Sequence, residues 1–370
     1  PGQYNIALAS RQPGSSFKPI VYAAAFNEGY TPETVLFDVA TQFSTRCDAY
    51  GNPRGSASKA DCYMPENYDG LFRGPVSLRE ALAQSLNIPA VKILYLSGIS
   101  NAISLAQAMG LSTITTFDRY GLSLVLGGGE VTLLELTNAY GVFANNGIYH
   151  KEQGILEIRD KDGEILEKFS PIEKEVLPET VTSLISSVLS DNVARTPTFG
   201  SNSALYFQNR PVAVKTGTTN DYKDVWVVGY TPSIVIGMWA GNNDNTPIDK
   251  KTAGFVLAPT WRKAMIAATN DTQIEYFPDP LPNTSSVPIL RGEYCSGGTI
   301  STILAQVNKT NPNQPPTSPY GDAQYSLWQT GIDNWISKNG NPCFNNSSNN
   351  GTTTVSSSTS IVIPPTNVIP

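Results

Sequence analysis

The sequence has little charge and almost no histidine. Charged residues make up 15% of the 370 residues, against about 25% in typical soluble domains. The net charge of −6 argues against a nucleic-acid binder, which needs a basic surface to neutralise phosphates. With His150 as the single histidine and only four cysteines, the composition argues against a His-based triad, a His-rich metal site and an iron–sulfur cluster. We therefore predict chemistry that uses Ser, Lys, Asp, Glu, Tyr or backbone amides, with no metal and no cofactor.

The chain also lacks a long hydrophobic run and an initiating methionine. No apolar stretch approaches the roughly 18 residues of a membrane span, and the sequence opens at Pro1 without a signal peptide. We therefore expect a piece of a longer protein, in which any membrane anchor lies upstream. At the other end, residues 345–370 are rich in Asn, Ser, Thr and Gly. This composition predicts a disordered tail.

The four cysteines lie in polar segments. Cys47 and Cys62 flank a polar loop, and Cys295 and Cys343 flank a stretch rich in Pro and Asn. Local pairing of loop cysteines predicts two disulfides, 47–62 and 295–343, and an oxidising compartment. Four free thiols or a zinc site are the alternatives, although no CxxC spacing supports zinc.

The predicted elements run in the order helices, adjacent strands, helix. A capping box at Ser77 and Glu80 and a hairpin over 154–169 are the clearest local signals. The other helices are expected at 15–29, after Pro89, near 100–109, near 132–145, after Pro178 and after Pro259. Strands are expected at 211–216, 225–230 and 233–240. This order predicts an α+β fold with an antiparallel sheet flanked by helices, and the absence of GxGxxG and P-loop motifs indicates no nucleotide site.

One short motif combines a hydroxyl with an amine. Ser15 and Lys18 lie three residues apart at a predicted helix start, and therefore on one face. Burial and neighbouring positive charge can lower a lysine pKa until the amine acts as a base. The helix start also provides N–H groups for an oxyanion. The spacing alone is weak evidence, because Ser56 and Lys59 match it too and an isolated match is more often a solvated pair.

Two further motifs follow. Ser85-Leu86-Asn87 interrupts two helices, where the serine can relay a proton and the asparagine can donate from its amide; a plain turn is the alternative. Lys215-Thr216-Gly217-Thr218 ends a strand, where the glycine admits a substrate backbone and the lysine and threonines suit a carboxylate. A generic strand end is the alternative there. SxxK, SxN and KTG in this order form the motif set of β-lactamases and penicillin-binding proteins.

The resemblance extends beyond these motifs. From about Tyr4 to Thr269 the chain resembles the transpeptidase domain of class A penicillin-binding proteins. The stretches that carry this resemblance are 11–19, 63–70, 76–82, 85–91, 129–132, 144–147, 189–192, 210–221, 225–226 and 229–232. The resemblance implies the β-lactamase/transpeptidase-like fold. Because Ser15 lies so close to the start, we expect that the N-terminal strands of the sheet are missing, which leaves an open sheet edge and a marginally stable or poorly soluble fragment.

The resemblance also implies an acylation site. Ser15 would attack the penultimate D-Ala carbonyl of a D-Ala-D-Ala stem peptide, and Lys18 would take its proton. Ser85 would relay a proton to the leaving D-Ala, with Lys215 tuning it. Asn87 would orient the substrate and help to hold Lys18.

Substrate binding and turnover follow from the same resemblance. Thr216 and Thr218, on either side of Gly217, would bind the terminal carboxylate. The N–H groups of Ser15 and Thr218 would form the oxyanion hole. The amine of a neighbouring stem peptide would resolve the acyl-enzyme into a crosslink, whereas β-lactams would trap Ser15.

The resemblance implies a domain plan and a location. We expect a truncated transpeptidase domain at 1–276, a small extension at 277–344 and the tail at 345–370. The tryptophans of the extension, Trp328 and Trp335, are interpreted as packing residues, or alternatively as sugar-stacking residues. The full-length protein would add a membrane helix and a glycosyltransferase domain, and would act on glycan strands derived from lipid II at the extracytoplasmic face of the bacterial cell membrane.

Three alternative functions share the motif set. A β-lactamase needs a base for water, and Glu130–Leu134 matches the E-x-x-L-N segment only in part, since Leu134 replaces the asparagine. A D,D-carboxypeptidase would pass the same acyl group to water. A penicillin-binding sensor or scaffold would have no turnover.

Overall fold

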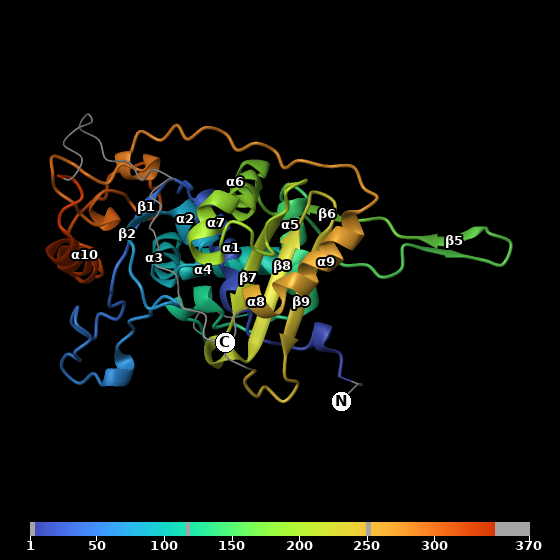
Figure 1. The fold of residues 1–370 in the computed structure, drawn as a ribbon, viewed down its shortest axis with the longest axis horizontal. Coiled ribbons are helices and arrows are strands. Elements are labelled where there is room, and N and C mark those ends of the chain that lie inside the picture. Colours follow the sequence, from blue (N-terminus) through green and yellow to red (C-terminus); the bar gives the residue numbers. More distant parts are fainter. Residues whose placement is uncertain (1–3, 116–118, 249–252, 345–370) are drawn as a thin grey trace.

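A three-stranded antiparallel sheet runs through the middle of the molecule (Figure 1). The structure is a computed structural model that describes residues 4–115, 119–248 and 253–344. The strands, in the order β7-β8-β9, are Ala213–Thr218, Asp224–Tyr230 and Val235–Gly241. The pairing sets Lys215 opposite Val228. Among the described residues, β9 pairs with β8 alone.

Helices cover both faces of this sheet. Because alternate side chains point to opposite faces, one set joins the larger core: Ala213, Trp226, Val228 and Tyr230. The other set packs beneath α8 and α9, and consists of Val214, Val225 and Val227. The helices of this second layer span Ala253–Val256 and Ala258–Thr269. The arrangement confirms the predicted α+β fold with an antiparallel sheet between helices.

The larger core is built around one buried helix. A 3-10 turn, η2, over Gly14–Phe17 leads directly into α1 over Lys18–Asn27, and all of α1 except its last residue is buried. Pro19 occupies the first turn, where its missing N–H has no intrahelical partner to lose. The predicted helix after Ser15 is therefore confirmed. Its burial on every side explains why its sequence is apolar all round.

Helices α2, α3, α4 and α6 pack against α1, while α5 packs against the central sheet and α7 against α2. The capping box at Ser77 and Glu80 is present and starts α2. The helices α2 to α5 span Leu78–Ala83, Asn87–Ser97, Ile99–Ala108 and Leu133–Ala144. The helices α6 and α7 span Glu179–Ser190 and Asn192–Phe199. Within the described residues, no single helix is long and apolar enough for a membrane span, although α3 and α4, bent by 91°, meet that test as a pair.

Three two-stranded sheets accompany the central sheet in the described residues. The pairs are β1 (Val35–Asp38) with β2 (Gly74–Ser77), β3 (Ile148–His150) with β6 (Glu173–Glu175), and β4 (Glu157–Arg159) with β5 (Ile165–Lys168). The predicted hairpin over 154–169 is confirmed and projects from the body of the molecule (Figure 1). The sequence prediction missed β1 and β2, because four-residue strands carry too short an alternation to recognise.

The extension beyond residue 277 packs onto the larger core. Its helices are η7 (Pro288–Arg291), η8 (Ile303–Ala305) and α10 (Tyr325–Asn339). Trp328 on α10 is 1% exposed and meets Phe43 and Tyr95 edge to face, with ring centroids 6.0 and 5.5 Å apart. Trp335 packs against Phe37 in the same way. These contacts favour the packing interpretation of both tryptophans over sugar stacking.

The sequence prediction missed α10, which lies in a region rich in Pro, Asn and Ser. Its apolar face packs against β1 and α3, through Trp335 on Phe37 and Trp328 on Tyr95. Both expected cysteine pairs are disulfide-bonded in the structure, Cys47 to Cys62 and Cys295 to Cys343. The predicted tail over 345–370 lies outside the described residues.

Candidate active site

The three motifs meet at one place. Ser15 lies on η2, Ser85 lies between α2 and α3, and Lys215 lies on β7. The Lys215 ammonium nitrogen lies 2.7 Å from the Ser85 hydroxyl. Lys18 Nζ donates to the Ser85 carbonyl at 2.7 Å and lies 3.5 Å from the Ser85 hydroxyl. Two lysines that are far apart in the sequence therefore converge on one serine.

Lys18 is held by the second motif. Its Nζ also donates to the Leu86 carbonyl at 3.0 Å and to Asn87 Oδ1 at 2.8 Å. The predicted contact between Asn87 and Lys18 is thus present. Among the hydrogen bonds of the described residues, none joins Lys18 to the Ser15 hydroxyl, although both lie at the junction of η2 and α1. The Lys18 amine is therefore held by residues 85–87 of the second motif.

The structure distinguishes the two adjacent serines of the first motif. Ser16 is fully buried, and its hydroxyl donates to the Pro13 carbonyl at 2.6 Å. Ser15 is only partly buried, and its hydroxyl has no hydrogen-bond partner among the described residues. The second match to the motif, Ser56 and Lys59, is exposed in a polar loop. Of these candidate nucleophiles, Ser15 is therefore the one that is both accessible and close in sequence to a buried lysine, Lys18.

Two glycines allow the first and third motifs to touch. A Cβ on Gly217 would lie 2.3 Å from the Pro13 carbonyl oxygen, and one on Gly14, at φ +55°, would lie 2.6 Å from the Thr218 carbonyl oxygen. Real Cβ atoms do not approach backbone this closely, so any side chain here would push β7 away from η2. At Gly217 the backbone that approaches closely is that of Pro13 in the same chain, whereas the sequence predicts a substrate backbone there. This contact brings Thr218 next to the turn that carries Ser15.

The two threonines of the third motif differ in their surroundings. Thr216 is 7% exposed, and its carbonyl accepts a hydrogen bond from Lys215 at 3.0 Å. Thr218 is partly buried, and its hydroxyl oxygen accepts from the Ala253 N–H at 3.2 Å. The Thr218 O–H can still donate to a ligand, because an oxygen that accepts keeps its own proton.

Burial and a neighbouring positive charge bring each of the two lysines toward neutrality. Burial, and then the positive charge of Lys215, lower the pKa of Lys18 well below its usual value, while Asp38 raises it. Burial and the nearby Arg195 lower the pKa of Lys215 to about 7. A lysine that is partly neutral near physiological pH can act as a base.

Ser85 has an unusual backbone. Its φ of +63° lies in the left-handed region, which non-glycine residues seldom adopt and which costs of order 1–3 kcal/mol. Its N–H donates to the Leu82 carbonyl, and its own carbonyl accepts from Lys18. This kink ends α2 and aims the serine at the lysines. The sequence signal was the break between two helices.

Arg195 was not predicted. It lies on α7, is 3% exposed, and donates to the Leu189 carbonyl at 2.7 Å. Its charge repels a proton on Lys215, and burial lowers its own pKa to about 10. No local pattern marks such a residue, because its effect depends on the tertiary packing that brings Arg195 near Lys215. In the part of the chain that the structure describes, no cluster of His, Cys, Asp and Glu could hold a metal ion.

The buried lysines predict that stability rises with pH. Burial holds the pKa of Lys215 and of Lys92 at about 7 in the folded state, against 10.5 ordinarily. Between these values the unfolded chain binds protons that the folded chain does not. The free energy of unfolding should therefore rise from about pH 7 to pH 10, by on the order of 1 kcal/mol per pH unit for each lysine.

Urea titrations at several pH values measure this slope. The Lys92→Met variant, which removes one of the two groups, should show a smaller slope. Above about pH 10 the trend should reverse, because buried tyrosines such as Tyr230, whose pKa burial raises, keep protons that the unfolded chain loses. A free energy of unfolding that falls between pH 7 and pH 9 would contradict the lowered pKa of the buried lysines.

The fold and the converging SxxK, SxN and KTG motifs define the class that contains β-lactamases and penicillin-binding proteins. Residues 3–265 match the model of the penicillin binding protein transpeptidase domain, and the chain belongs to this family. It is 37% identical over 287 residues to penicillin-binding protein 1A of Aquifex aeolicus, which covers 76% of this chain and 36% of that protein. It is 31% identical over 327 residues to penicillin-binding protein 1A of Neisseria flavescens, covering 83% of this chain and 38% of that protein. The chain thus spans little more than a third of these relatives.

Solved structures share the fold. Penicillin-binding protein 1A of Haemophilus influenzae superposes with a TM-score of 0.65 at 25% identity, over 75% of this chain and 45% of that one. PonA1 of Mycobacterium tuberculosis, solved in complex with penicillin V, gives 0.62 at 22% identity, over 76% of this chain and 75% of that one.

Proposed function

We propose that this chain crosslinks peptidoglycan stem peptides as a D,D-transpeptidase, through an acyl-enzyme on Ser15. The observation that carries the proposal is the convergence of Lys18 and Lys215 on the Ser85 hydroxyl, with the accessible Ser15 three residues from Lys18. Membership of the transpeptidase family supports the same conclusion.

In the acylation step, Ser15 Oγ attacks the carbonyl carbon of the penultimate D-Ala. Neutral Lys18 accepts the hydroxyl proton, and the amide bond to the terminal D-Ala breaks. Ser85 passes a proton to the departing amine and is replenished from Lys18, 3.5 Å away. Lys215, 2.7 Å from the Ser85 hydroxyl, stabilises negative charge on that oxygen while the proton moves.

In the second step, the amine of another stem peptide attacks the ester carbonyl. Lys18 takes the amine proton, a new amide forms, and Ser15 leaves as an alkoxide that recovers the proton. The N–H groups of Ser15 and Thr218 hold the carbonyl oxygen in both steps, and the hydroxyls of Thr216 and Thr218 bind the terminal carboxylate. In a β-lactam the leaving amine stays tethered to the acyl group, so the adduct on Ser15 persists.

We further propose the cellular setting. Two disulfides fit a location outside the cytoplasm. The chain covers about a third of relatives named penicillin-binding protein 1A, which fits a full-length protein with a membrane anchor and a glycosyltransferase domain. Residues 1–276 would form the transpeptidase domain and residues 277–344 an extension seated on its core, followed by the tail at 345–370.

The fate of the acyl group tests this function. The purified chain is given a donor peptide ending in D-Ala-D-Ala together with an amine acceptor, and products are separated by mass. We expect the crosslinked amide to exceed the hydrolysed peptide. Release of D-Ala without the amide would indicate a D,D-carboxypeptidase, rapid penicillin turnover a β-lactamase, and no adduct with penicillin a sensor or scaffold.

A further inference from the structure

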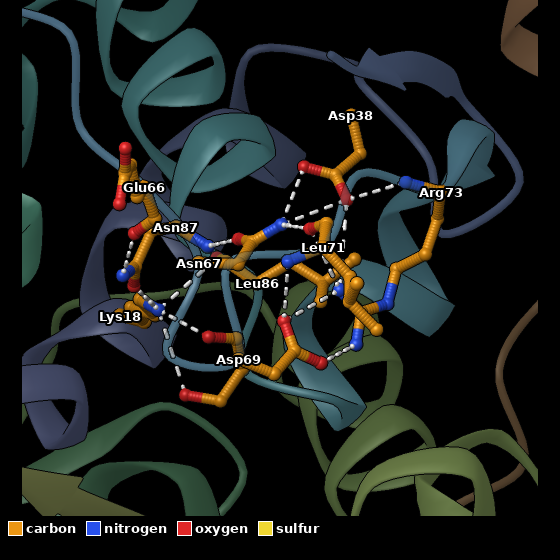
Figure 2. A network of polar contacts seen from close by, with 10 residues as sticks. Lys18, Asp38, Glu66, Asn67, Asp69, Leu71, Arg73, Leu86 and Asn87 are labelled. Carbon is orange, nitrogen blue, oxygen red and sulfur yellow. Dashed lines mark hydrogen bonds and ion pairs between the residues drawn. The ribbon is translucent and has the colours of Figure 1, made fainter. Parts of the chain in front are cut away.

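The helix that carries the second motif begins without a local cap. The residue before α3 is Leu86, whose side chain cannot accept a hydrogen bond. Instead, the first N–H of the helix, that of Asn87, donates to Asn67 Oδ1 at 2.7 Å (Figure 2). An exposed first N–H is one of the unsatisfied donors at every helix start. Here it is satisfied by an asparagine twenty residues upstream.

The orientation of the Asn67 amide is set by a buried carboxylate. Asn67 Nδ2 donates to Asp38 Oδ1 at 2.8 Å and Oδ2 at 2.9 Å, and to the Leu71 carbonyl at 2.8 Å. All three oxygens can only accept when the carboxyl is ionised. The NH₂ group must therefore face Asp38, and Oδ1 must face Asn87. The side chain of Asp38 is fully buried at the end of β1.

The neighbouring backbone fixes the side chain of Asn87 in the same way. Asn87 Nδ2 donates to the Glu66 carbonyl at 2.7 Å, which leaves Oδ1 to accept from Lys18 Nζ at 2.8 Å. Residues 66 and 67 thus hold both the main chain and the side chain of Asn87 (Figure 2). This contact lies two residues from the kink at Ser85 that aims its hydroxyl.

We propose that Asp38 and Asn67 are positioning residues of the active site, which act through Asn87 to hold the Lys18 amine on the proton path between Ser15 and Ser85. They touch neither the substrate nor the reacting atoms in this mechanism. The hydrogen bonds that run from Asp38 through Asn67 to Asn87, called the clamp here, are present in the structure. Their effect on acylation rests on the proposed function.

The charge of Asp38 is balanced by several groups. The Arg73 N–H donates to it at 3.0 Å, and the Arg73 guanidinium lies 3.9 Å away. Lys92 on α3 also faces it, donating to the Phe37 carbonyl next in sequence at 2.7 Å. Tyr22 of α1 is the further titratable group whose pKa this carboxylate raises.

The charges that act on Lys18 come from Lys215 on β7, which lowers its pKa, and from Asp38 on β1, which raises it. The carboxylate therefore has an electrostatic effect on the base as well as a geometric one.

The first test removes the cap. In Asn67→Ala, the second-order rate of acylation by penicillin should fall about tenfold to a hundredfold, because small displacements of catalytic groups cost that much. Hydrogen exchange at the Asn87 amide should accelerate in parallel. The matched control is Asp69→Asn in the same loop, which loosens the contacts of Asp69 with Arg73 and Leu71 but leaves Asn67 and Asn87 joined. It should stay within about twofold of wild type on the same reasoning.

The second test keeps the shape and removes the charge. Asp38→Asn can still accept from Asn67 with one oxygen, but it no longer favours the charged form of Lys18. The pH at which acylation becomes half-maximal should therefore shift to a lower value. A purely structural defect would reduce the rate equally at every pH, so an unshifted profile would overturn the role of Asp38.

These outcomes separate the inference from the function on which it rests. If wild type forms no adduct, the proposed function fails, and exchange at Asn87 still decides whether the clamp exists. If Asn67→Ala does not fold, the pH dependence of acylation in the isosteric Asp38→Asn variant decides whether Asp38 acts on Lys18. Wild-type acylation with unchanged exchange in Asn67→Ala, or an equal loss in Asp69→Asn, would overturn the proposal.

Discussion

Replacing Ser15 with alanine should abolish covalent modification by penicillin, from one adduct per chain to none. Acylation needs an oxygen nucleophile that solvent and ligand can reach and that lies beside a base. Ser15 is partly exposed and lies three residues from Lys18, whose pKa is lowered by burial. Intact mass spectrometry after incubation with penicillin, on wild type and Ser15→Ala, measures the effect directly.

Two other serines provide matched controls for this experiment. Ser16→Ala removes the adjacent hydroxyl, which is buried and bonded to Pro13. Ser56→Ala removes the serine of the second, exposed SxxK match. Both variants should still form one adduct per chain. An adduct that survives in Ser15→Ala and disappears in Ser16→Ala would show that Ser16, and not Ser15, is the nucleophile.

Replacing Lys18 with methionine should slow acylation by penicillin by about a hundredfold to ten-thousandfold, the usual contribution of a general base. Methionine preserves the length and apolar stem of the side chain but cannot take the Ser15 proton. It also leaves the carbonyls of Ser85 and Leu86 and the Asn87 amide oxygen without their donor. Stopped-flow or quenched mass measurements give the rate, and thermal melting shows whether the variant is folded.

The control for this substitution is Lys59→Met. Lys59 occupies the same position in the second SxxK match, but it is exposed and donates to the Gly51 carbonyl in the loop closed by Cys47 and Cys62. Its rate should equal that of wild type. A folded Lys18→Met that is acylated at the wild-type rate would show that Ser15 uses another base, and Lys215 would then be the first group to test.

The packing of the extension bears on how the domain is assembled. Trp328 lies over the Lys92 ammonium group, 5.2 Å from ring centroid to Nζ, and Lys92 lies on the helix that begins at Asn87. Residues from 289 to 332 share the core with α1 and α3. The extension therefore stabilises the same helix that presents the second motif.

Much of this protein could be predicted from the sequence, because the signals are local. The capping box at Ser77, the proline that opens α9 and the hairpin over 154–169 are set by bonds within a few residues, and all three occur where expected. The order of helices and strands defined the fold class for the same reason. The near absence of histidine indicates lysine as the base, and the three motifs contain the residues of the candidate site.

Only the tertiary structure decided how these parts meet. The choice of Ser15 over Ser16, the kink at Ser85 and the role of Arg195 depend on packing between distant elements. The cap of α3 joins residues twenty positions apart, and its carboxylate comes from a four-residue strand with no recognisable pattern. Side-chain type and spacing determine what chemistry is available, whereas burial and long-range contacts determine which groups are charged, aligned and accessible.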